Sequence, residues 1–68
     1  MDAAAIGKRL KDARVKTGKS LHDVSMALDI SKSALAMYEI GKRIPRDNVK
    51  VKLAAFYGVS VEALFFAA

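Results

Sequence analysis

The sequence predicts an all-α fold in which five short helices form one compact bundle. Apolar residues recur at helical spacing in successive segments, and glycine or proline ends most of these segments. No run alternates apolar and polar residues over the length of a strand, and no Asn-Gly or Asp-Gly hairpin signal is present. At 68 residues the chain is expected to form a single domain, residues 1–68, with a small core.

The first helix is expected over Ala3–Lys16. Ile6, Leu10 and Ala13 are spaced so that they share one buried face. Gly18 then supplies the residue type that most readily ends a helix in the left-handed conformation. Most of the charged positions in this segment are lysine or arginine, so its outer face should be basic.

The second helix is expected to follow Ser20 and to run about two turns, to Leu28. Ser20 with Asp23 three residues later resembles a capping box that uses a shorter acid. Leu21 and Val24 would share its buried stripe with Leu28.

The third helix is separated from the second only by Asp29 and Ile30 and is expected to end near Glu39 or Ile40. Ser31 repeats the capping signal, and Leu35 and Tyr38 continue the buried stripe. The side chains expected on its outer face are Lys32, Ser33, Ala36 and Met37.

Gly41 and Pro45 predict a basic loop over residues 41–46, because the first favours a left-handed helix end and the second prevents ready resumption of the helix. A fourth helix should then be capped by Asp47 or Asn48 and closed by Gly58. Its expected buried side is Val51, Ala54 and Tyr57, with Leu53 adjoining. Ser60 should cap a last short helix from Val61 to about Phe66, with Leu64 and Phe65 returning to the core.

Composition points toward a polyanionic partner. Twelve Lys and Arg residues against seven Asp and Glu residues give a net charge of +5 and a pI near 9.8, which attracts nucleic acid at long range. The absence of cysteine and the single histidine favour neither a metal site nor a disulfide, and no cofactor is expected. Apolar runs are too short to cross a bilayer, so a cytoplasmic, nucleoid-associated protein without a membrane partner is expected.

The segment from Ser20 to Pro45 suits double-stranded DNA, because a helix fits the major groove and its first turn faces the base edges. Lys32 could donate to guanine O6 and N7, Ser33 discriminates weakly, and Ala36 and Met37 offer apolar contact to a thymine methyl. Phosphate contacts are expected from two helix starts and from the basic loop. These candidates are Ser20, Leu21, His22, Ser31, Lys42, Arg43 and Arg46. The alternative for Lys32 and for the loop cations is ordinary solvent exposure.

The chain resembles the Cro/repressor type of helix-turn-helix protein, the XRE family, which includes the lambdoid phage repressors. The resemblance extends from Ile6 to Phe65 and is carried by ordered segments. These are Ile6-Gly7-Lys8-Arg9-Leu10, Arg14, Gly18, Leu28-Asp29-Ile30-Ser31, Tyr38-Glu39-Ile40-Gly41-Lys42-Arg43-Ile44-Pro45, Leu53-Ala54 and Gly58-Val59-Ser60-Val61-Glu62-Ala63-Leu64. It implies a lambda repressor-like fold whose second and third helices form the helix-turn-helix, and a structural ion pair between Arg14 and Glu39.

Three departures from the family pattern bear on DNA reading. Leu21 stands where members often place a glutamine that contacts phosphate, and Asp29 stands where the turn glycine is common. The reading face offers Ala36 and Met37 in place of long polar side chains, so recognition is expected to depend on Lys32, phosphates and DNA shape.

The sequence therefore predicts a sequence-specific DNA-binding regulator, a repressor acting as a homodimer on a pseudo-palindromic operator. Candidates for the dimer surface are Phe56, Val61, Phe65 and Phe66. Core packing is the alternative for all four and is favoured for Phe65. The alternative function is a protein-interaction module on the same fold, such as an anti-repressor, antitoxin or co-regulator with a partner regulator protein. An enzyme is not expected, because His22 beside Asp23 has no third catalytic partner and the acids are scattered.

Overall fold

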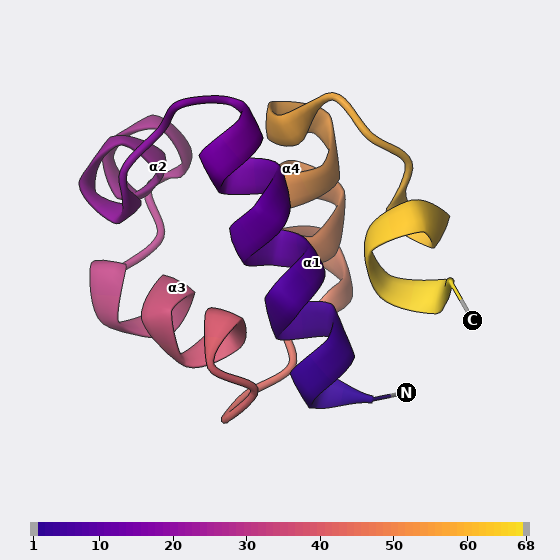
Figure 1. Ribbon diagram of the computed structural model, residues 1–68. Coiled ribbons are helices and arrows are strands. Elements are labelled where there is room, and N and C mark those ends of the chain that lie inside the picture. Colours follow the sequence, from indigo (N-terminus) through magenta and orange to yellow (C-terminus); the bar gives the residue numbers. More distant parts are fainter. Residues whose placement is uncertain (1, 68) are drawn as a thin grey trace.

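The computed structural model describes residues 2–67, which form four α-helices and a closing π-helical turn and include no strand (Figure 1). The elements are α1 Ala3–Lys16, α2 Leu21–Leu28, α3 Lys32–Glu39, α4 Asp47–Tyr57 and η1 Glu62–Phe66. In Figure 1, α2 and α3 lie on one side of α1 and η1 lies on the other. The all-α prediction of five helical elements is confirmed.

Local hydrogen bonds start the two central helices where the sequence predicts. The amide of Asp23 donates to Ser20 Oγ over 3.0 Å, and the Ser20 amide donates to Asp23 Oδ2 over 2.9 Å, which completes the capping box. Ser31 Oγ accepts from the amide of Ala34 over 3.0 Å. Asp29 ends α2 in the left-handed region, with φ 54°, which aspartate tolerates better than most residues.

The core is a single cluster to which every helix contributes. Ile6 and Leu10 of α1, Val24 of α2 and Leu53 of α4 are its most completely buried large side chains. The remaining buried members are Leu35, Tyr38, Ala54, Tyr57, Leu64 and Phe65. Burial of this kind contributes about 25 cal/mol per Å² of apolar surface, and it fixes α3 with its outer face toward solvent.

The fourth helix differs from the prediction at its start and at one position of its buried side. Neither Asp47 nor Asn48 is the cap, because α4 begins at Asp47 and Arg46 is its N-cap, without a side-chain hydrogen bond. Val51 was predicted to be buried, but it is 59% exposed. The buried positions are Lys50, Leu53, Ala54 and Tyr57.

Lys50, and not Val51, occupies the first buried turn of α4. Its side chain is buried, and its Nζ lies 5.8 Å from the ring centroid of Phe65, 5.2 Å from that of Phe66 and 3.5 Å from Asp47 Oδ1. A lysine stem can cover apolar surface while its ammonium contacts aromatic faces and a carboxylate. The burial of Lys50 was not predicted, whereas Leu53, Ala54 and Tyr57 are buried as predicted.

The closing element is held in place by α1. Ser60 Oγ accepts from the amide of Ala63 over 3.0 Å, as predicted for its cap. The guanidinium of Arg9 donates to the carbonyls of Leu64 over 3.1 Å and Ala67 over 2.9 Å. These long-range bonds fasten η1 to α1 and turn Phe65 into the core.

The contact between α1 and α3 brings backbone against backbone. A Cβ added to Gly7 would lie 2.4 Å from the carbonyl oxygen of Glu39 and 2.7 Å from that of Tyr38. Gly41, with φ 77°, similarly approaches Ala4, whose Cα would lie 3.1 Å from an added Cβ. Glycine permits both approaches because it has no side chain. The end of α3 and the loop after it are thereby set against the first turns of α1.

Candidate nucleic-acid interface

The outer face of α3 begins with exposed polar side chains. Lys32 and Ser33 occupy its first turn and are exposed, and Met37 one turn later is 37% exposed. Ala36 is half-buried. Leu35 lies on the opposite side in the core. The structure thus brings the predicted base-reading residues to one side of the helix, with Ala36 the least accessible.

The starts of α2 and α3 leave backbone amides unpaired. Within residues 2–67, the amides of Leu21 and His22 form no hydrogen bond, and neither do those of Lys32 and Ser33. Free amides and the helix dipole give a helix start a positive potential that favours anions. Ser20 Oγ accepts the capping hydrogen bond from the Asp23 amide, and its hydroxyl hydrogen has no acceptor within residues 2–67.

The start of α4 is a third such position, and it was missed from the sequence. No side chain caps this helix, so the amides of Asp47, Asn48 and Val49 are unpaired within the described chain. The missing cap could have been noticed, because Arg46 is not a capping residue type. The neighbouring acid and amide were instead interpreted as caps.

The loop over residues 41–46 is folded back on the end of α3. The amides of Lys42 and Arg43 donate to the carbonyl of Met37 over 2.9 Å and 3.4 Å, and Pro45 is buried. The side chains of Lys42, Arg43 and Arg46 are exposed, and none forms an ion pair with any residue from 2 to 67. Three unneutralised cations therefore stand on a loop of fixed shape beside α3.

Arg14 joins three segments that frame this surface. Its Nε donates to Glu39 Oε2 over 2.7 Å and its Nη2 to Oε1 over 3.1 Å, while its Nη1 donates to the carbonyl of Lys19 over 3.0 Å. The hydrogen bond to Glu39 raises the pKa of Arg14 above its ordinary value, so the guanidinium stays charged. One guanidinium thus ties α1 to the end of α3 and to the loop before α2.

The predicted dimer-surface residues separate into two groups. Phe66 is 58% exposed, and Phe56 and Val61 are half-buried. Phe65 is 2% exposed and belongs to the core, the role that the sequence favoured for it, so it drops out of the dimer candidates. Of these two adjacent phenylalanines, only Phe66 is exposed enough to contact a partner.

The polar pair His22 and Asp23 has a structural explanation. Asp23 accepts the hydrogen bond that closes the capping box, and this bond from Ser20 lowers the pKa of its carboxyl group. Among residues 2–67 no three His, Asp or Glu side chains gather into a set that could hold a metal ion. None of the helices described has the length and apolar character needed to cross a bilayer.

Comparisons with known proteins agree with this geometry. A family model described as helix-turn-helix matches residues 10–64. The HTH-type transcriptional regulator ImmR of Bacillus subtilis (strain 168) is 37% identical over 60 residues, which cover 88% of this chain and 47% of ImmR, so the chain spans about half of that relative's length. Two solved structures of the BldD DNA-binding domain, one titled as that of S. venezulae, match with TM-scores of 0.81 at 32% identity. They cover 93% of this chain and 94% and 92% of their own.

Proposed function

Since the chain belongs to the helix-turn-helix family of Cro/repressor (XRE) type, we propose that it is a sequence-specific DNA-binding transcriptional regulator. In this proposal residues 1–68 act as one domain that binds double-stranded DNA on the nucleoid, in the cytoplasm. The observation that carries it is the exposed first turn of α3, which is flanked by unpaired amides at helix starts and by unneutralised loop cations. The relatives are described as a transcriptional regulator and a DNA-binding domain, not as enzymes.

Base reading is assigned to α3 lying in the major groove. Lys32 donates to the O6 and N7 of a guanine, and Ser33 adds a less selective hydrogen bond. Met37 contacts a thymine methyl, and half-buried Ala36 contributes only a shallow apolar edge. With so few polar readers, DNA shape and deformability supply the rest of the specificity.

Phosphate contacts fix the orientation of α3. The amides at the starts of α2 and α3, around Ser20, Leu21, His22 and Ser31, bind phosphates on one side of the groove. The cations of the loop and the free amides of α4 bind on the other side. These cations are Lys42, Arg43 and Arg46.

We further propose that the protein binds as a homodimer and represses transcription. One module of this size reads few bases, and a two-fold pair on a pseudo-palindromic operator doubles the site. Exposed Phe66, with the half-buried Phe56 and Val61, supplies the apolar surface for a self-complementary contact. A domain that occupies promoter DNA represses by exclusion alone.

The test combines selection from a random DNA pool with a salt series. A two-fold symmetric motif and a steep fall in affinity with salt are expected. Lys32→Ala should cost about 1–3 kcal/mol and relax one position of the motif, while Lys42→Ala should weaken all sequences equally and lower the salt slope by about 1. Lys52→Ala, on the exposed side of α4, is the matched control and should change neither.

Two outcomes would contradict the proposal. An unenriched pool would remove sequence specificity. Binding without salt dependence, or no binding to DNA, would instead favour a protein-interaction module that docks on a partner regulator through Phe66.

A further inference from the structure

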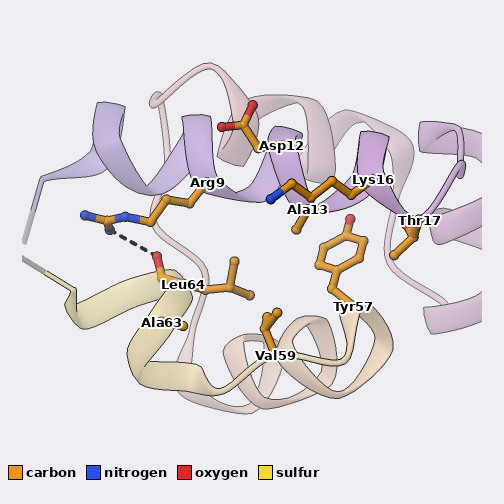
Figure 2. A pocket seen from close by; sticks show the side chains of 9 residues that line it. All are labelled: Arg9, Asp12, Ala13, Lys16, Thr17, Tyr57, Val59, Ala63 and Leu64. Atoms are coloured by element: carbon orange, nitrogen blue, oxygen red, sulfur yellow. Dashed lines mark hydrogen bonds between the residues drawn. The ribbon is translucent and has the colours of Figure 1, made fainter.

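A cavity of about 320 Å³ lies between α1, the end of α4 and η1 (Figure 2). Ala13, Val59 and Leu64 give it apolar walls, and Arg9, Lys16 and Tyr57 supply polar atoms. Its volume is close to the lower end of the roughly 300–1,000 Å³ found for small-molecule sites. No lining residue belongs to α3 or to the loop over residues 41–46, so this cavity is separate from the surface assigned to DNA.

The hydroxyl of Tyr57 is the unusual feature of the cavity. The residue is only 7% exposed, and its ring extends from the end of α4 toward α1 (Figure 2). The hydroxyl forms no hydrogen bond within residues 2–67. Every fully enclosed polar side-chain atom in this range has a partner, so the hydroxyl is not fully enclosed. The hydroxyl therefore contacts solvent through the cavity that Tyr57 lines. Burial, and after it the charge of the Glu39 carboxylate, raises the pKa of Tyr57 to about 12, so the hydroxyl stays protonated as a hydrogen-bond donor.

The charges around the opening favour an anion. Lys16 lines the cavity and forms no ion pair with any described residue. Asp12 also belongs to the lining, but Figure 2 shows its carboxylate directed away from Tyr57. Arg9 is engaged with the carbonyls of Leu64 and Ala67 and closes one end. An available cation and a buried hydroxyl donor thus border an apolar wall.

We propose that this cavity binds a small organic carboxylate. The carboxylate accepts the hydrogen bond of Tyr57 and pairs with Lys16, while the apolar body of the ligand packs against Val59 and Leu64. The hydrogen bond from Tyr57 and the ion pair with Lys16 orient the ligand. The apolar wall supplies most of the affinity.

The experiment is a titration of the isotope-labelled chain, followed by backbone amide chemical shifts, with benzoate, phenylacetate and hexanoate in turn. At least one acid should give saturable shifts confined to residues 9–17 and 57–64, with a Kd on the order of 1 mM. The matching alcohol, which keeps the apolar body and lacks the charge, should bind about tenfold more weakly.

Variants separate this site from general attraction to a basic protein. Tyr57→Phe keeps the ring and removes the hydroxyl, and it should weaken binding about threefold to tenfold, as should Lys16→Gln. Lys11→Gln, on the exposed face of α1 outside the cavity, is the matched control and should leave binding unchanged. The proposal is overturned if none of the three acids gives saturable shifts up to about 10 mM. Equal binding by wild type and Tyr57→Phe, or equal weakening by Lys11→Gln and Lys16→Gln, would overturn it as well.

Discussion

Replacing Glu39 with alanine should destabilise the fold sharply. The substitution removes two of the three hydrogen bonds of the Arg14 guanidinium and leaves only the one to the Lys19 carbonyl. The side chains of Arg14 and Glu39 are 15% and 9% exposed, so the stranded guanidinium would remain largely out of water. Breaking a buried pair costs about 3–5 kcal/mol, and the residual exposure and surviving bond place Glu39→Ala near the lower limit, at about 3 kcal/mol.

Thermal and urea unfolding followed by far-UV circular dichroism measures this effect. In a domain of this size each kcal/mol shifts Tm by about 4–8 °C, so a cost of about 3 kcal/mol should lower Tm by about 12–24 °C. The control is Glu62→Ala, which removes an exposed glutamate of η1 and should stay within about 0.5 kcal/mol of wild type. Arg14→Ala should cost at least as much as Glu39→Ala, because it also releases the Lys19 carbonyl.

A double variant completes the test. Arg14→Met combined with Glu39→Leu removes both charges, so it should be more stable than either single alanine variant. The reasoning would be refuted by a Glu39→Ala melt that coincides with the Glu62→Ala melt. It would also be refuted if the double variant lost the full sum of the single costs, since the two side chains would then act independently.

Three further substitutions test other parts of the fold. Gly7→Ala should lower stability by about 1–3 kcal/mol in urea melts, because its Cβ would lie 2.4 Å from the Glu39 carbonyl oxygen; an unchanged midpoint would contradict the close approach. Asp29→Gly should raise stability by up to about 1 kcal/mol, since glycine relieves the left-handed φ of 54°, and a lower midpoint would argue against this. The bond from Ser20 holds the pKa of Asp23 below its ordinary 3.8, so the stabilisation by Asp23 is complete above that pH and is lost as the pH falls through the lower native pKa. In the Asp23→Asn variant the free energy of unfolding should therefore fall less steeply as the pH is lowered. An identical fall in both proteins would refute the assignment.

The parts of the fold that depend on neighbouring residues were predictable. Ser20 and Ser31 start α2 and α3 through bonds to amides three residues away. Gly41 and Gly58 adopt the left-handed backbone that follows α3 and ends α4. These signals are local in sequence, so pattern alone locates them. The burial of Lys50 in place of Val51 was not predictable in this way, because it depends on aromatic rings from the end of the chain.

The candidate site was predictable in composition and only partly in geometry. The exposed first turn of α3 and the basic loop follow from periodicity and from Gly41. The additional bond of Arg14 to Lys19 and the clamp of Arg9 on η1 join positions whose association only the folded chain creates. The free amides of α4 were missed because Asp47 was interpreted as a cap when it is already inside the helix.

The glycine contact between α1 and α3 limits how the molecule can respond to whatever it binds. Where side chains separate two helices, rotamer changes can absorb a small displacement, but at Gly7 carbonyl oxygens meet a bare Cα. The two helices therefore move as one rigid template. A bound surface whose shape does not match these helices must itself deform. Binding therefore depends on how easily that surface deforms and not on the flexibility of the protein.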